Sequence, residues 1–151
     1  MNEGLFHIRE AHGRDLAAVD ALSLAEDMGH IGSLQDVQVA VNHEDQVVGF
    51  IRLVFDDKGV CHVSPVVVYP TWRRFGVGRA LVEGALGRHG ELRLVSRGSS
   101  LAFYQSLGFE ETPWETILGT IAHDCDECPI IEECKPVPLR KSLTHEGHGR
   151  A

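Results

Sequence analysis

Two arginines and two glycines stand together where a β-branched run gives way to an apolar helical pattern. The stretch is Arg73-Arg-Phe-Gly-Val-Gly78, shortly after Val66-Val-Val-Tyr69. Glycines let backbone N–H groups converge on one point without an obstructing Cβ, and a helix beginning there adds its own unbonded N–H groups and dipole. The spacing fits a bound phosphate at this turn and close packing of the helix against the strand equally well.

Three cysteines and a histidine form a second group with recognisable chemistry. His123, Cys125, Cys128 and Cys134 lie within twelve residues, and the C-x-x-C spacing lets two thiolates bind one ion. Zinc, with His123 as the fourth ligand, is our first expectation. An iron–sulfur cluster with an outside ligand, free thiols and a Cys125–Cys128 disulfide are the alternatives.

The elements that must position these groups follow from hydrophobic periodicity. Helices are expected over residues 14–28, 76–88 and 99–107. Strands are expected over residues 5–8, 37–41, 47–55, 60–69, 92–95 and 137–143. Tight turns join three of the strands, including a hairpin signal at Asp56-Asp-Lys-Gly59. The order predicts a mixed α/β layer that contains an antiparallel meander.

A further helix is predicted from residue 112 onward. Thr112-Pro-Trp-Glu115 has the residue types of a capping box, with proline at the first helical position. The helix would place several apolar side chains on one face, namely Trp114, Ile117, Leu118 and Ile121.

Size and composition limit the class of protein. A chain of 151 residues with 43% hydrophobic and 24% charged residues is typical of one soluble globular domain. The net charge of −8 disfavours a nucleic acid partner, which usually selects a basic excess. No signal peptide is evident, and no apolar run approaches the 18 or so residues of a membrane span, so we expect a cytoplasmic protein with no membrane partner.

Two blocks of the sequence resemble the GCN5-related N-acetyltransferases (GNAT). Arg73-Arg-Phe-Gly-Val-Gly78, following Val68-Tyr-Pro70, is similar to the acyl-CoA-binding signature (Q/R)-x-x-G-x-(G/A). Ala102-Phe-Tyr-Gln-Ser-Leu-Gly-Phe109 is similar to the later FY-x-x-LGF block. The resemblance is strong over residues 37–111 and rests on element order before them.

The resemblance implies the GNAT fold, an α/β fold with a mixed, mostly antiparallel sheet flanked by helices. Residues 1–111 would form the acetyl-CoA-binding core. Residues 112–143 would add a C-terminal helix, the cysteine-rich extension and a last strand to the same domain. Residues 144–151 would be a mobile tail.

The resemblance also implies how acetyl-CoA is bound. Pantetheine would pair with the backbone of Val66 and Val68, and the amide near Val67 would stabilise the oxyanion. The following turn would hold the pyrophosphate with Arg73, Arg74, Phe75, Gly76, Val77, Gly78 and Arg79. Tyr104 matches the tyrosine that protonates the departing CoA sulfur, with ring packing in the core as its alternative role.

A general base is expected on the strand that precedes the turn. His62 lies six residues before Val68, where several GNAT members carry a glutamate base, and histidine changes charge near neutral pH. A satisfied structural histidine is the alternative, and Ser64 acting through a water is another. Phe103 and Phe109 are expected in the core. Arg97 replaces a common asparagine and would contact phosphate, contact the acceptor or be solvated.

The function implied is an acetyl-CoA-dependent N-acetyltransferase that acts by direct attack of a primary amine of a small molecule or amino acid. A homodimer is a further expectation from the family. The cysteine cluster also resembles that of short N-acetylglutamate synthases, which makes glutamate acetylation in arginine biosynthesis an alternative. Against it, His62-Val-Ser64 and Tyr104 replace Glu-Ile-Arg and phenylalanine. The same residues are also compatible with a non-catalytic acyl-CoA-binding regulator or with a peptide acetyltransferase.

Overall fold

The computed structural model describes residues 4–126 and 131–143, with the backbone alone for residues 123–126 and 133. The chain has the predicted mixed α/β fold, with a mostly antiparallel sheet in the strand order β1-β2-β3-β4-β5-β7-β6 and flanking helices. It divides into two compact units, one reaching to Leu53 together with Pro65–Ala85, the other Val54–Ser64 together with the chain from Leu86 onward. No helix in the described ranges is long and apolar enough to cross a membrane.

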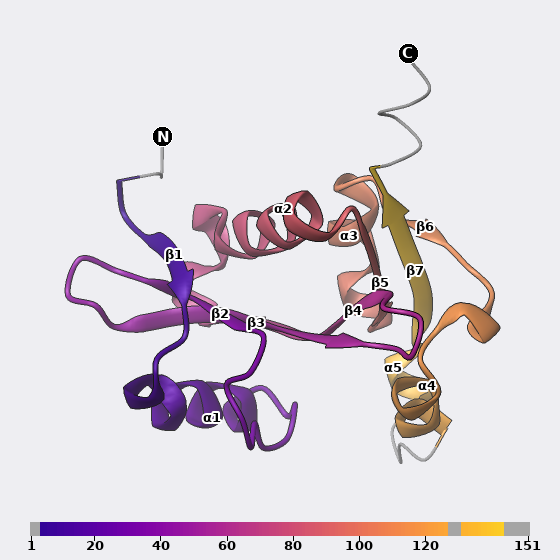
Figure 1. Cartoon of the computed structure of the whole chain (residues 1–151), viewed down its shortest axis with the longest axis horizontal. Coiled ribbons are helices and arrows are strands. Elements are labelled where there is room, and N and C mark those ends of the chain that lie inside the picture. Colours follow the sequence, from indigo (N-terminus) through magenta and orange to yellow (C-terminus); the bar gives the residue numbers. More distant parts are fainter. Residues whose placement is uncertain (1–3, 127–130, 144–151) are drawn as a thin grey trace. The chain divides into compact units, whose positions relative to one another are not determined.

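The first unit contains the N-terminal strands and both helices that pack on them. Its elements are β1 (His7–Glu10), the 3₁₀ helix η1 (Gly13–Asp15), α1 (Leu16–Ala25), β2 (Val37–Val41), most of β3 (Val47–Phe55), the end of β4 (Cys61–Val68), the 3₁₀ helix η2 (Pro70–Phe75) and most of α2 (Val77–His89). β1 and β2 pair antiparallel, as do β2 and β3. α1 and α2 lie on opposite sides of these strands (Figure 1).

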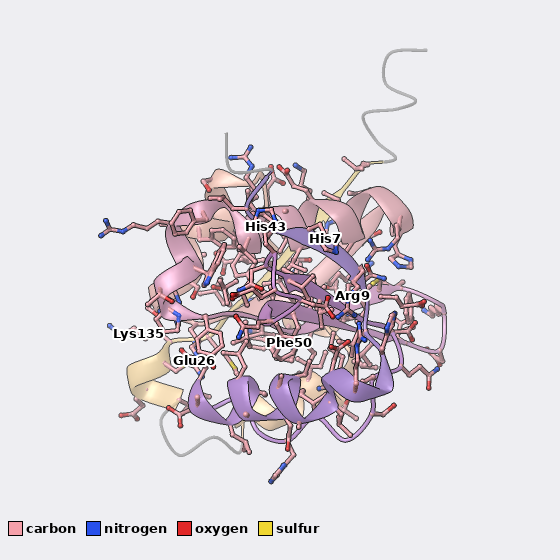
Figure 2. The ribbon with its side chains drawn as sticks, turned by 90° about the vertical axis from the view of Figure 1, so that its left-hand side faces the viewer. His7, Arg9, Glu26, His43, Phe50 and Lys135 are labelled. Atoms are coloured by element: carbon pink, nitrogen blue, oxygen red, sulfur yellow. The ribbon has the colours of Figure 1, made fainter. Side chains whose placement is uncertain are left out.

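The core of the first unit lies on both faces of β2 and β3, with residues 47–51 buried without interruption. Val39 and Phe50 are directly opposite each other, and both are fully buried. Phe50 lies on the α1 side of the strands (Figure 2), in a cluster with Val19 and Leu22 of that helix. Burying each such side chain contributes about 1.5–3 kcal/mol, which fixes α1 against this face.

The second unit contains the remaining elements. They are the end of β3, the start of β4, the end of α2, β5 (Glu91–Ser96), the 3₁₀ helix η3 (Gly98–Ser100), α3 (Leu101–Ser106), β6 (Glu110–Glu111), the 3₁₀ helix η4 (Trp114–Thr116), α4 (Gly119–Asp126), α5 (Ile131–Cys134) and β7 (Val137–Ser142). β4 runs parallel to β5, with His62 opposite Arg93, whereas β7 pairs antiparallel with both β5 and β6.

The prediction of a helix from Thr112 is wrong about where the helix begins and about which apolar side chains share one of its faces. Trp114–Thr116 forms a 3₁₀ turn without a side-chain cap, Ile117 is extended and buried, and the α-helix begins only at Gly119. The Thr112 hydroxyl contacts the Thr116 hydroxyl at 3.0 Å instead of capping a helix. Tertiary burial of Ile117 overrides the local capping signal.

Candidate active site

In the first unit, the glycine–arginine turn joins β4 to α2 through one left-handed residue. Gly76 has φ 81° and ψ 14°, a conformation that costs other residues roughly 1–2 kcal/mol. The first intrahelical bond joins the Ala80 N–H to the Gly76 carbonyl at 3.0 Å. The N–H groups of Val77, Gly78 and Arg79 precede it, so the helix begins with amides that can receive an anion. Gly78 lies within the first turn of α2.

The three arginines of the turn differ in their partners. Arg73 donates from Nη2 to Glu26 Oε1 at 2.6 Å and from Nε to the Val68 carbonyl at 3.3 Å. Arg79 donates to Glu83 Oε2 at 3.1 Å, an exposed pair one helical turn apart. Arg74 is exposed and makes no ion pair within the described residues, which leaves it as the cation best placed to meet a phosphate.

Gly49 in β3 was not predicted to matter, yet it sets how closely this turn can pack. A Cβ at Gly49 would lie 3.0 Å from Val77 Cγ1 and 3.1 Å from the Val67 carbonyl oxygen. Only glycine lets β3, the end of β4 and the first turn of α2 approach this closely. The signal that could have revealed it is a lone glycine inside an otherwise apolar strand.

The end of β4 presents the residues expected to bind pantetheine. Val67 is buried, whereas Val66 and Val68 are half-buried. Beyond them the Tyr69 N–H donates to the Val48 carbonyl at 2.9 Å, which anchors the strand end on β3. The expected backbone contacts of Val66 and Val68 with a cosubstrate stay predictions.

In the second unit, Tyr104 is held in α3 among aromatic rings. Its residue is 7% exposed, and its ring meets the rings of Phe103 and Phe109 edge-on at centroid distances of 5.0 and 5.6 Å. Burial raises the pKa of the Tyr104 phenol above its ordinary value of about 10, so the group keeps its proton at neutral pH. Among the described residues, no hydrogen-bond partner of its hydroxyl is found. Phe109 is buried as predicted, but Phe103 is 38% exposed and therefore not a core residue.

The Leu-Gly-Phe end of the second sequence block closes α3. Gly108 has φ 94°, and the Phe109 N–H returns to the Tyr104 carbonyl at 3.1 Å. Lys141 Nζ donates to the Leu107 carbonyl at 2.7 Å, and a Cβ on Gly108 would lie 2.9 Å from that nitrogen. Glycine is therefore favoured by the left-handed turn, and a Cβ here would displace the end of the Lys141 side chain.

His62 is fully buried in β4, and both of its ring nitrogens meet backbone groups. Nε2 accepts the Leu118 N–H at 3.0 Å, and Nδ1 lies 3.2 Å from the Val60 carbonyl. Because Nε2 is an acceptor, Nδ1 carries the proton and donates to Val60. This bonding favours the structural alternative, in which His62 fastens the segment before α4 to β4.

The cysteine cluster falls largely outside the described part of the chain. Cys128 lies in the undescribed segment, as do the side chains of His123 and Cys125, while Cys134 is half-buried. No group of three or more histidine, cysteine, aspartate or glutamate side chains within the described ranges could hold a metal ion. Zinc at these four residues therefore stays a prediction from the sequence.

Comparison with known proteins gives one family match and several relatives. Residues 35–111 match the family model of the acetyltransferase (GNAT) domain. An uncharacterised N-acetyltransferase of Chlorobaculum tepidum is 27% identical over 116 residues, which are 75% of this chain and 74% of that protein. The peptidyl-lysine N-acetyltransferase YjaB of Escherichia coli is 38% identical over 77 residues, 49% of each chain.

Among solved structures, the N-acetylglutamate synthase from Neisseria gonorrhoeae, in complex with coenzyme A and N-acetyl-glutamate, has a similar fold. The TM-score is 0.75 at 18% identity, over 93% of this chain and 36% of that one. The chain thus spans about a third of that synthase, and the likeness is one of fold.

Proposed function

The chain belongs to the GNAT acetyltransferase family, and we propose that it transfers the acetyl group of acetyl-CoA to a primary amine of a small molecule or amino acid. The observation that carries this proposal is the left-handed Gly76 at the start of α2, within the matched region. The N–H groups of Val77, Gly78 and Arg79 follow it at the start of α2, and phosphate groups are ligands that such helix amides favour.

The proposed reaction is a direct attack. The neutral amine nitrogen forms a bond to the thioester carbonyl carbon, the carbon–sulfur bond breaks, and the CoA thiolate takes a proton from the Tyr104 hydroxyl. The attacking nitrogen loses its proton to water, and Tyr104 regains one from solvent. At its ordinary pKa of about 10 the Tyr104 phenol is already protonated at neutral pH, and burial raises that pKa further, so the hydroxyl is present as a donor when the thiolate leaves. Such positioned proton transfer contributes roughly 10²–10⁴-fold to rate.

We do not propose His62 as the general base. A buried imidazole whose two nitrogens both serve backbone groups has no lone pair to offer an incoming amine. The pH dependence of turnover tests whether His62 accepts the amine proton. If it does, the pH–rate profile of a His62 variant should lose its limb near neutral pH.

A peptide lysine is the second candidate acceptor. The observation that favours it is the 38% identity with the peptidyl-lysine acetyltransferase over 77 residues, since that stretch is the highest identity of the relatives described above. Glutamate is a third acceptor class, supported by the likeness in fold to the N-acetylglutamate synthase. These acceptors differ in charge and length, so a single panel separates them.

The test is release of free CoA from acetyl-CoA by the purified protein, alone and with glutamate, other amino acids, polyamines, arylamines and a lysine-containing peptide. Turnover with one class establishes the transferase and names its acceptor. If no acceptor gives turnover while acetyl-CoA raises the melting temperature, the chain acts as an acyl-CoA-binding regulator and the proposal fails.

Two further expectations belong with this proposal. Zinc at His123, Cys125, Cys128 and Cys134 predicts about one zinc per chain in protein purified without added metal, and a content near zero would rule it out. A homodimer predicts twice the chain mass by light scattering, and the monomer mass would exclude it.

A further inference from the structure

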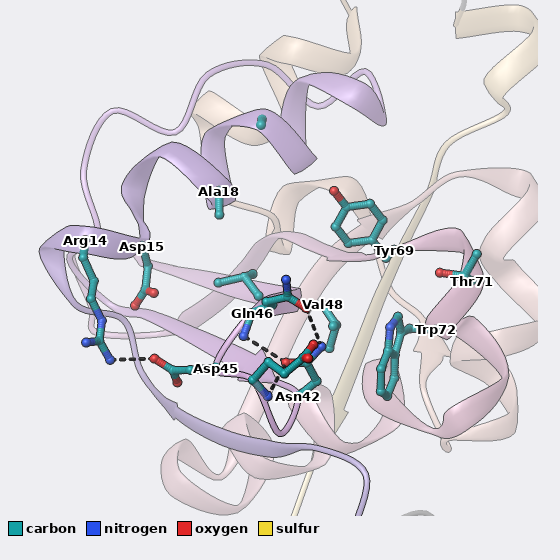
Figure 3. A pocket seen from close by; sticks show the side chains of 13 residues that line it. Arg14, Asp15, Ala18, Asn42, Asp45, Gln46, Val48, Tyr69, Thr71 and Trp72 are labelled. Carbon is teal, nitrogen blue, oxygen red and sulfur yellow. Dashed lines mark hydrogen bonds and ion pairs between the residues drawn. The ribbon is translucent and has the colours of Figure 1, made fainter.

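The first unit holds a cavity that the sequence did not predict. Its volume is about 610 Å³, within the usual range for sites of small molecules. Its walls come from η1 and α1, from the β2–β3 hairpin loop and the start of β3, and from Tyr69 and η2 (Figure 3). The groups that decide its chemistry are Arg14, Asp15, Glu44, Asp45, Tyr69 and Trp72.

The charges that line the cavity leave a negative excess. Asp45 is paired with both Arg9 and Arg14, at 3.2 and 2.7 Å. Asp15 is paired with Arg9 at 2.8 Å and also accepts the His12 N–H. The exposed Glu44 carboxylate makes no ion pair among the described residues, while the one lining arginine, Arg14, is already neutralised. An anion in the cavity would be repelled by the Asp15, Asp45 and Glu44 carboxylates. A cation would be attracted by Glu44, whose charge no arginine in the described ranges neutralises.

Two aromatic rings border the same cavity. Tyr69 is 47% exposed, and Trp72 is half-buried with its ring 5.3 Å from that of Phe75. Figure 3 shows the Tyr69 and Trp72 side chains on one side of the cavity, across from Gln46 and Asn42. Asn42 fixes that wall by donating to Gln46 Oε1 at 2.9 Å and by accepting the Gln46 N–H at 2.9 Å. Partly exposed aromatic rings and an uncompensated carboxylate that line one cavity are surroundings that favour an organic ammonium group.

We propose that this cavity binds a small organic cation, with its ammonium group between the rings of Tyr69 and Trp72 and the carboxylate of Glu44. Binding of such a cation requires neither acetyl-CoA nor a transferable proton, so it can be tested independently of acetyl transfer. A quaternary ammonium fits the description as well as a primary one, and it cannot accept an acetyl group on nitrogen.

The test uses choline and its neutral isostere 3,3-dimethyl-1-butanol, titrated into the protein without acetyl-CoA and followed by NMR. Choline should shift the Trp72 indole N–H and the amides of the hairpin loop, and the alcohol should not. Glu44→Gln and Trp72→Leu should each weaken choline binding roughly two- to fivefold, as expected for a cation at a partly exposed aromatic site.

The matched controls are Glu10→Gln and Trp114→Leu, an exposed carboxylate and an exposed indole outside the cavity. Both should bind choline as the unmodified chain does. If Trp72→Leu fails to fold, Glu44→Gln on the exposed hairpin decides the matter. Equal binding of the alcohol, shifts elsewhere, or no loss in the Glu44 variant would overturn the proposal, whatever the outcome of the acetyl-transfer assay.

Discussion

The glycine–arginine turn of the first unit and the Tyr104 region of the second unit are fixed by different features. At the turn, the decisive feature is a backbone conformation at Gly76, and the surrounding arginines are exposed. Around Tyr104 and His62 the side chains themselves are buried. Exposed charges are screened by solvent, whereas burial raises the pKa of the Tyr104 phenol.

The difference predicts which changes each region tolerates. The glycine–arginine turn should tolerate the loss of an arginine charge better than the replacement of Gly76 by a residue that disfavours the left-handed conformation. The buried region should respond strongly to the loss of one polar atom. The following variants test that contrast, from the largest effect to the smallest.

Tyr104→Phe removes one hydroxyl and should lower kcat about 100-fold or more, because the CoA thiolate loses its proton donor. The KM for acetyl-CoA should change little. Steady-state kinetics measure both, with Gln105→Ala on the exposed side of the same helix as the control. Unchanged turnover in the Phe variant would leave Tyr104 with a packing role alone.

His62→Ala should lower the free energy of unfolding by about 2–4 kcal/mol, because the Leu118 N–H and the Val60 carbonyl lose their partner and a cavity opens. Turnover of the folded protein should persist with its pH profile intact. Urea unfolding measures the stability, and His43→Ala on the exposed hairpin loop should cost less than about 0.5 kcal/mol. A large loss of kcat without loss of stability would restore His62 as the base.

Gly76→Ala should weaken CoA binding by up to about thirtyfold. An alanine held in the left-handed region is strained by about 1–2 kcal/mol, and the free turn can relieve that strain by moving whereas the CoA-bound turn cannot. A Cβ at this position would meet no atom within 4 Å, so the cost is conformational rather than steric. Calorimetric titration with CoA measures it. Gly87→Ala within α2 should bind CoA normally, and equal affinities of the two variants would refute the backbone explanation.

Substitution of Asp15 has the smallest expected effect on stability, and that effect depends on pH. The bonds from Arg9 hold the pKa of the Asp15 carboxyl below its ordinary value of 3.8. Its contribution to stability is therefore present above that value and is lost as pH falls through the lowered pKa. Melting temperatures measured from neutral pH to well below pH 3.8 should fall less steeply in Asp15→Asn than in the unmodified chain. Asp57→Asn should keep the original slope.

Much of the fold followed from periodicity alone. The strands at residues 37–41 and 47–55 and the helix after Gly76 form within a residue of the predicted bounds, because their apolar positions repeat over long runs. The helix predicted from Thr112 failed because a capping box is a local signal, whereas Ile117 is buried by contacts distant in sequence. The prediction that Phe103 is a core residue failed for a related reason, since a motif does not state which of two neighbouring rings faces inward.

The candidate site was predictable where it depends on local backbone and less so where it depends on tertiary contacts. Gly76 could be named from the turn motif. The bond from Leu118 to His62 joins residues 56 positions apart, and the ion pair of Arg73 with Glu26 joins residues 47 apart. Neither pairing has a sequence signature. The cavity beside Trp72 likewise depends on three segments that the sequence keeps separate.

The most direct test of the central claim is mass spectrometry of the acceptor after incubation with acetyl-CoA, comparing the unmodified chain with Tyr104→Phe. The account predicts one acetyl group added to an amine, formed in step with free CoA, and at least a 100-fold slower appearance in the variant. CoA binding without an acetylated product from any acceptor class would contradict it.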